Sequence, residues 1–303
     1  MTTACTITLG ISLVLYLAAA LLFQGSFLLR RAGWELRGRR ALLVGVSVHA
    51  LGMGLHATLS GQSPFSSMLV VLSWLIIALL GAALLAEHYT RIRYLSLLAS
   101  PLAFLALLYP ILMPVQLAGS QYVLVQYPWL GVHVVLTLLG YVGFALAFCT
   151  AVTYLLQQRA LKSGRLNHYL PALDTAATAT FRFAGIGFSI FTLGLGMGII
   201  WLFGAPGEYL QGRDTKVWMA IPSWAVFAYY LYVRGIHRRH GSGLKWIVIV
   251  GFLLALANLV GVRHDFNETT PAPDGPTGVA VERRAPLVQL DGSAPNKPLP
   301  SLL

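Results

Sequence analysis

The chain has 303 residues, of which 57% are hydrophobic and 10% are charged, and its mean hydropathy is +0.71. This composition excludes a soluble globular protein with a polar surface and favours a polytopic membrane protein surrounded by lipid. The net charge of +11 would suit nucleic acid, but the placement of the basic residues explains it without such a partner, so we predict no nucleic-acid binding.

Eight segments are long and apolar enough to cross a hydrocarbon layer about 30 Å thick, which requires about 20 helical residues. In chain order they cover residues 6–29, 41–60, 67–86, 94–113, 129–156, 183–203, 217–233 and 244–262. The predicted fold class is therefore all-α: a polytopic transmembrane helical bundle of about eight spans. The first segment is longer than a signal-peptide core and no basic residue precedes it, so we predict that it is retained as a span.

Basic residues follow the first, third, fifth and seventh segments, whereas the alternate loops hold few. The first group comprises Arg30, Arg31, Arg37, Arg39, Arg40, Arg91, Arg93, Arg159, Lys162, Arg165, Arg182, Arg234, Arg238, Arg239 and Lys245. Because basic residues near span ends stay in the cytoplasm, both termini are predicted to lie outside it. After Asn267 the chain is rich in Pro, Gly, Ser and Thr, so we predict a bundle over residues 1–266 and a disordered extracytoplasmic tail over residues 267–303.

Four histidines are predicted to lie within or just outside the membrane. His56, His133 and His264 share one approximate depth near the outer face, and His49 lies two helical turns deeper on the same face as His56. An imidazole at lipid depth costs free energy unless it has a partner, and neutral imidazole is a common ligand of haem iron. We predict a haem b with His133 and either His264 or His56 as axial ligands. The alternative for each histidine is a structural hydrogen bond to a neighbouring helix.

Several short runs from residue 129 onward carry a family resemblance. Residues 129–135 read WLGVHVV, residues 154–159 read YLLQQR, residues 192–198 read TLGLGMG, residues 214–218 read DTKVW and residues 259–262 read LVGV. Together they resemble the cytochrome c assembly family, which includes CcsA-type haem-handling proteins and the HemX-like and YpjD-like inner membrane proteins. The resemblance covers residues 129–264 and is carried by the set of runs.

The resemblance implies that His133 and His264 are the external histidines that hold haem. In the haem-handling branch the external loop is rich in Trp followed by Asp-Pro-Lys, whereas residues 207–216 read GEYLQGRDTK here, so the chain is closer to the HemX-like and YpjD-like branch. Arg213 and Lys216 are candidates for binding the haem propionates or, alternatively, for capping the next helix, and Trp218 is a candidate contact to the macrocycle.

The function predicted from the sequence is haem binding and presentation in cytochrome c-type biogenesis, in the bacterial cytoplasmic (inner) membrane. Haem, other cytochrome c assembly proteins and apocytochrome c are the expected partners. The absence of Walker, H-E-x-x-H, G-x-S-x-G and C-x-x-C-H motifs favours non-covalent haem and a non-enzymatic role. Two alternatives are a scaffold or regulatory protein of haem biosynthesis without its own haem site, and a proton-coupled transporter of small solutes that uses His49 and His56. The glycines Gly194, Gly196 and Gly198 are predicted to allow close helix packing.

Overall fold

A computed structural model of the chain describes residues 3–29, 31–60, 67–90, 94–112, 128–164, 170–204, 215–238 and 241–261. The chain divides into two units, Met1–Glu268 and Thr269–Leu303, and all described residues belong to the first. The predicted tail over residues 267–303 lies outside the described residues.

The regular elements within the described ranges are eight α-helices, which confirms the all-α fold class. They are α1 (Thr3–Leu29), α2 (Ala32–Ser60), α3 (Met68–Thr90), α4 (Leu95–Leu112), α6 (Pro128–Lys162), α7 (Leu173–Gly204), α8 (Thr215–Gly235) and α9 (Ser242–Gly261). Two helices begin well before the predicted spans: α2 starts nine residues before position 41, and α7 starts ten residues before position 183. The charged residues at these starts lower the hydropathy without interrupting the helix, because a helix can continue beyond the hydrocarbon layer.

Seven of the eight helices are long and apolar enough to span a membrane, so the chain is a multi-pass membrane protein. The exception is α8, which has 21 residues but contains Lys216, Pro222 and Arg234. At about 1.5 Å per residue its length still matches the hydrocarbon thickness of about 30 Å. The prediction of about eight spans is therefore confirmed to this extent: the described residues form eight helices, of which seven meet the hydropathy of a span.

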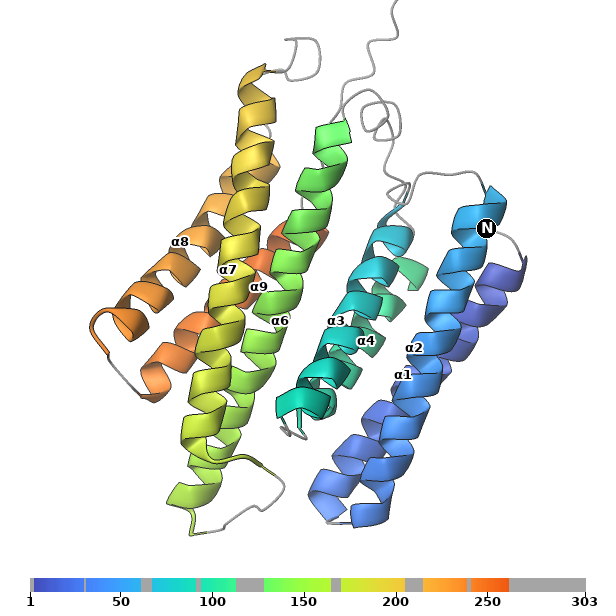
Figure 1. The fold of residues 1–303 in the computed structure, drawn as a ribbon. Helices are drawn as coiled ribbons and strands as arrows, with labels where there is room; N and C mark the ends of the chain where they lie inside the picture. The colour runs from blue at the N-terminus through green and yellow to red at the C-terminus, as the bar shows by residue number, and fades with distance from the viewer. Residues whose placement is uncertain are drawn as a thin grey trace, which may run out of the picture. The chain divides into compact units, whose positions relative to one another are not determined.

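The helices form two groups that meet at α6 (Figure 1). In the first group α1 packs against α2 and α4, and α3 packs against α2 and α4. In the second group α6 packs most extensively against α7 and also against α9, while α8 packs against α7 and α9. Contacts from α3 and α4 to α6 join the two groups.

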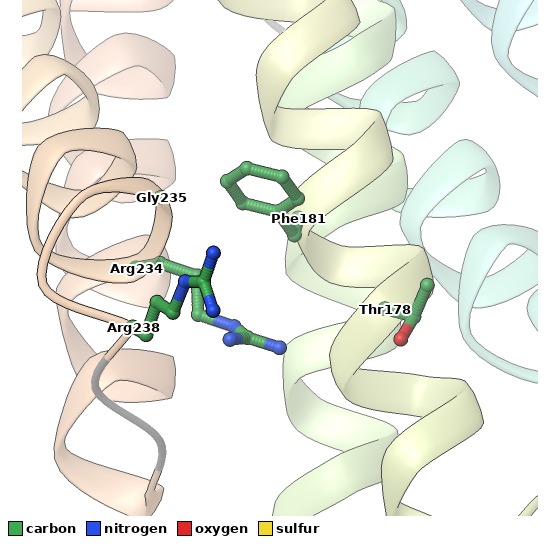
Figure 2. Close-up of a pocket in the computed structure, with 5 residues that line it drawn as sticks. All are labelled: Thr178, Phe181, Arg234, Gly235 and Arg238. Atoms are coloured by element: carbon green, nitrogen blue, oxygen red, sulfur yellow. The ribbon is translucent and has the colours of Figure 1, made fainter.

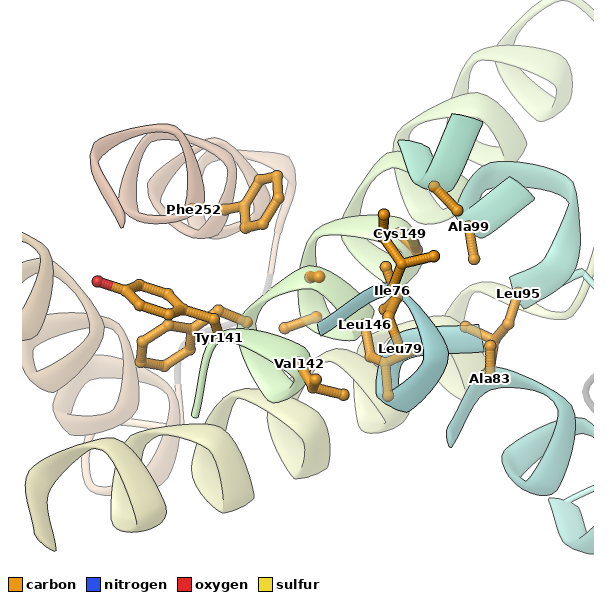
Figure 3. Packing of buried hydrophobic residues seen from close by; sticks show 14 of the residues in the cluster. Ile76, Leu79, Ala83, Leu95, Ala99, Tyr141, Val142, Leu146, Cys149 and Phe252 are labelled. Carbon is orange, nitrogen blue, oxygen red and sulfur yellow. The ribbon is translucent and has the colours of Figure 1, made fainter. Parts of the chain in front are cut away.

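Apolar side chains from α3, α4, α6 and α9 fill the junction between the groups (Figure 3). The labelled members are Ile76, Leu79 and Ala83 from α3, Leu95 and Ala99 from α4, Tyr141, Val142, Leu146 and Cys149 from α6, and Phe252 from α9. On the outside, large apolar residues such as Leu21, Leu51, Leu105 and Leu193 are exposed. An apolar exterior is what a bilayer requires, since lipid tails replace water as the solvent.

A buried carboxyl group fixes the start of α4. Glu87, near the end of α3, accepts a hydrogen bond from the backbone N–H of Ser96 at 2.7 Å and another from the Ser96 hydroxyl at 2.9 Å. The first N–H groups of a helix have no partner within the helix, so a side chain that accepts from them stabilises the helix start. Glu87 therefore links the end of α3 to the first turn of α4.

Candidate functional site

The site is built on the interface between α6 and α7, where glycines bring the two helices into close contact. A Cβ added at these glycines would collide with the facing helix, and the facing pairs are Gly143 with Gly187, Gly140 with Phe191, Thr137 with Gly194 and His133 with Gly198. The residue numbers rise along α6 as they fall along α7, so the two helices are antiparallel and the pairs repeat about once per turn. His133 and Gly198 form the pair closest to the start of α6.

The imidazole of His133 is held in one orientation by this interface. Its Nδ1 lies 2.6 Å from the carbonyl oxygen of Gly194 on α7. Because a carbonyl oxygen only accepts, Nδ1 carries the hydrogen and donates it. The proton on Nδ1 leaves the lone pair of the neutral ring on Nε2.

Gly198 provides the room that the His133 ring occupies. A Cβ at position 198 would lie 2.6 Å from Cε1 and 2.7 Å from Nδ1 of the ring, well inside van der Waals contact. A Cβ at position 196 would meet nothing within 4 Å. The prediction of close packing at Gly194, Gly196 and Gly198 is therefore confirmed for the first and last and wrong for Gly196, because that residue lies on another face of α7.

This arrangement of His133 fits the chemistry of an axial haem ligand. A metal-binding histidine almost always donates its other ring N–H to a carbonyl or carboxylate, which fixes the tautomer and makes the ligating nitrogen more basic. The Gly194 carbonyl is such a partner, and it directs the lone pair of His133 to Nε2. The side chain of His133 therefore has the orientation and tautomer that an axial ligand of haem would need.

His49 and His56 lie in the other helix group, on α2. Nδ1 of His49 shares a hydrogen bond of 3.0 Å with the hydroxyl of Tyr16 on α1, and both side chains are fully buried. Within the described part of the chain, Nε2 of His49 and both ring nitrogens of His56 are buried without a hydrogen-bond partner. Sequence reasoning missed Tyr16, whose position opposite His49 follows from the α1–α2 pairing and from no motif.

The structure separates His56 from His133 while it brings α9 close to α6. The helices that pack on α2 are α1 and α3, whereas α6 packs against α3, α4, α7 and α9. The α6–α9 contact is antiparallel: Phe148 packs against Phe252, and Asn258 donates a 3.4 Å hydrogen bond to the Tyr141 hydroxyl. The described part of α9 ends at Gly261, at the same end of the bundle as the start of α6 (Figure 1).

The other predicted site residues are described only in part. His264 and Arg213 lie outside the described residues, and of Lys216 only the backbone is described, in the first turn of α8. Trp218 is 68% exposed on α8. Trp224, by contrast, has a structural role: its Nε1 donates to the Thr192 hydroxyl on α7 at 3.0 Å.

Comparison with known proteins adds an independent observation. The family described as "Cytochrome C assembly protein" matches residues 49–265, which is more than two thirds of the chain and runs from His49 past His264. The chain belongs to this family. The matched region contains all four histidines predicted from the sequence as site residues: His49, His56, His133 and His264.

Individual relatives carry the name "Cytochrome c biogenesis protein CcsA". The protein of Guillardia theta is 25% identical over 225 residues, which cover 67% of this chain and 74% of the relative. The protein of Mesostigma viride is 22% identical over 255 residues, covering 76% and 83%, respectively. The protein of Chlamydomonas reinhardtii is 28% identical over 138 residues, covering 46% of this chain and 38% of the relative. The predicted resemblance to the cytochrome c assembly family is therefore confirmed, while assignment to its HemX-like branch stays a prediction.

Proposed function

We propose that the chain is a membrane protein of cytochrome c biogenesis that holds a non-covalent haem b at its outer face, with His133 as one axial ligand. The single observation that carries this proposal is the hydrogen bond from Nδ1 of His133 to the Gly194 carbonyl. It leaves the lone pair on Nε2, as iron ligation requires. The family match and the names of the CcsA relatives supply the biological setting.

The second ligand is proposed to be His264 rather than His56. The last described residue of α9, Gly261, is three positions before His264, and α9 packs directly against α6. The hydrogen bond between Asn258 and Tyr141 places these two residues at one level of the bundle. At 1.5 Å per residue, His133 lies about 12 Å along α6 from that level, and the end of α9 lies about 4–5 Å from it in the same direction. Three further residues of chain are long enough to cover the remaining axial distance of about 7–8 Å at up to about 3.5 Å each. His56 belongs to α2, which is not among the helices that pack extensively on α6.

The remaining residues of the proposed site act on the haem periphery. Haem propionates are anions that pair with cations, and Arg213 and Lys216 are proposed as these cations. Lys216 is in the first turn of α8, the helix that follows the end of α7 carrying Gly198. Trp218 is exposed one turn into α8 and is proposed to contact the macrocycle. His49 and His56 are proposed as further haem-binding residues, because Nε2 of His49 and both ring nitrogens of His56 are buried without a hydrogen-bond partner among the described residues.

Haem would supply the iron porphyrin for apocytochrome c. The role proposed for this chain is to bind and orient the haem, without making a covalent bond. We therefore propose a non-enzymatic role in which haem and apocytochrome c, or other assembly proteins, are the partners. We propose that both termini lie outside the cytoplasm, as the basic loops indicate by the positive-inside rule, and that the membrane is the bacterial cytoplasmic membrane.

Two measurements on the intact protein test this function. Protein purified in mild detergent is expected to show a Soret band, and cells that lack the gene are expected to lose mature c-type cytochromes. Loss of cytochromes without a Soret band, even after haemin is added, would favour the scaffold alternative. Proton-coupled solute uptake into vesicles, without either result, would favour the transporter alternative.

A further inference from the structure

An open pocket lies between α7 and the end of α8, at the opposite end of the helices from His133. It has a volume of about 400 Å³ and is lined by Thr178 and Phe181 from α7 and by Arg234, Gly235 and Arg238 from the end of α8 and the turn that follows (Figure 2). Both guanidinium groups reach from the α8 side toward α7 (Figure 2). Pockets that bind small molecules generally have volumes of about 300–1,000 Å³, so this one is large enough for a ligand.

Among the described residues that line the pocket, the two charged ones, Arg234 and Arg238, are both positive. Arg234 lies 5.8 Å from the centre of the Phe181 ring, and it is close enough to Lys245 on α9 for their like charges to repel. Lys245 is itself buried, with its Nζ 4.9 Å from the centre of the Tyr154 ring. Arg234, Arg238 and Lys245 thus lie near the end of α8 and the start of α9, and none of the described residues that line the pocket is acidic. The acidic residue of α7, Asp174, lies one turn before Thr178 and is exposed.

The backbone contributes to this gathering of charge. Arg238 has a φ of 49°, the left-handed region that residues with a side chain rarely adopt. This turn leaves Arg238 lining the same pocket as Arg234, four residues earlier (Figure 2). Strained backbone that brings like charges together points to a ligand of opposite charge.

We propose that this pocket binds the phosphate of an anionic membrane lipid such as phosphatidylglycerol. Arginine guanidinium groups bind phosphate through paired N–H donors, and the Thr178 hydroxyl adds a further donor. The pocket lies at the end of the bundle where the basic loops indicate the cytoplasmic surface, and basic pockets between helices on that side bind anionic headgroups. Ile236, which directly follows the lining residue Gly235, is exposed, and an acyl chain would contact it there.

The test is lipid binding by the purified full chain, measured by native mass spectrometry with phosphatidylglycerol and phosphatidylcholine of identical acyl chains. Phosphatidylglycerol is expected to bind more tightly. Each arginine near a membrane surface changes anionic-lipid affinity about fivefold, so Arg234→Gln with Arg238→Gln is expected to weaken phosphatidylglycerol binding about 25-fold. The control is Arg159→Gln with Arg182→Gln, which removes the same charge from exposed positions near the same end of the bundle and is expected to change binding less than threefold.

Equal loss in the pocket variant and the control would overturn the proposal, since it would show a general effect of charge. Equal binding of the two lipids would also overturn it. If millimolar inorganic phosphate displaces phosphatidylglycerol from the pocket and binds with the same dependence on Arg234 and Arg238, the ligand is a soluble anion instead. Arg238→Gln alone, at an exposed position, keeps the test valid if the double variant does not fold, and it is expected to weaken binding about fivefold.

Discussion

Replacing Gly198 by alanine is expected to displace the His133 ring from its present position. The new Cβ would lie 2.6 Å from Cε1 and 2.7 Å from Nδ1, whereas heavy atoms in contact normally lie about 3.5–4.0 Å apart, so the ring must move by about 1 Å. A shift of that size stretches the 2.6 Å hydrogen bond to the Gly194 carbonyl to about 3.6 Å, beyond hydrogen-bonding distance. Loss of the partner that orients a metal ligand typically weakens metal binding by about 10–100-fold, and we expect this loss in haem affinity.

Folding should respond less than haem binding. Alanine favours a helix over glycine by about 1 kcal/mol, which offsets part of an overpacking cost of about 1–3 kcal/mol. Haem affinity is measured by titrating haemin into the detergent-solubilised protein and following the Soret band. Gly196→Ala is the matched control, because nothing lies within 4 Å of its added Cβ, and it should bind haem as the wild type does. Wild-type haem affinity in Gly198→Ala would refute the assigned role of the His133–Gly194 hydrogen bond.

Three further changes test other parts of the structure. Alkaline phosphatase fused after Asn267 is expected to be active and the same fusion after Arg37 inactive, and the reverse pattern would invert the predicted orientation. Glu87→Gln replaces a carboxylate oxygen with an NH₂ group, which cannot accept a hydrogen bond from α4. It should lower the free energy of unfolding by about 1–3 kcal/mol, measured by denaturant titration. An unchanged midpoint would contradict the capping role. Tyr16→Phe leaves Nδ1 of His49 buried without a partner and should likewise lower the free energy of unfolding by about 1–3 kcal/mol. Wild-type stability would show that this hydrogen bond makes no net contribution to the stability of the protein.

The helices could be predicted from the sequence because hydropathy reflects the bilayer directly. A run of about 20 apolar residues has few alternatives to a membrane helix, and each predicted span corresponds to a helix. The starts of α2 and α7 were placed too late, because hydropathy reports the hydrocarbon boundary and not the helix boundary. Mean hydropathy likewise undervalues α8, where polar residues at the ends dilute a central apolar stretch.

The environment of the candidate site depends on pairings that one sequence does not specify. His133 could be selected from its residue type and position, but its partner is a backbone carbonyl, a group that every residue carries. Likewise the roles of Gly198 and Gly196 differ only because α7 presents one of them to α6. His56 and His133 were predicted to share one depth in the membrane, but they belong to separate helix groups. Depth along the membrane normal gives no information about position within the membrane plane.

The most direct test of haem ligation by His133 is the absorption spectrum of His133→Gly with and without free imidazole. The variant is expected to fold and insert at wild-type levels, to lose or strongly shift the Soret band, and to regain it when imidazole occupies the space left by the side chain. Rescue separates ligation from a general collapse of the site, because imidazole restores the ligand without restoring the covalent connection to α6. A wild-type Soret band in the variant without imidazole would contradict the account and identify His133 as a packing residue of the α6–α7 interface.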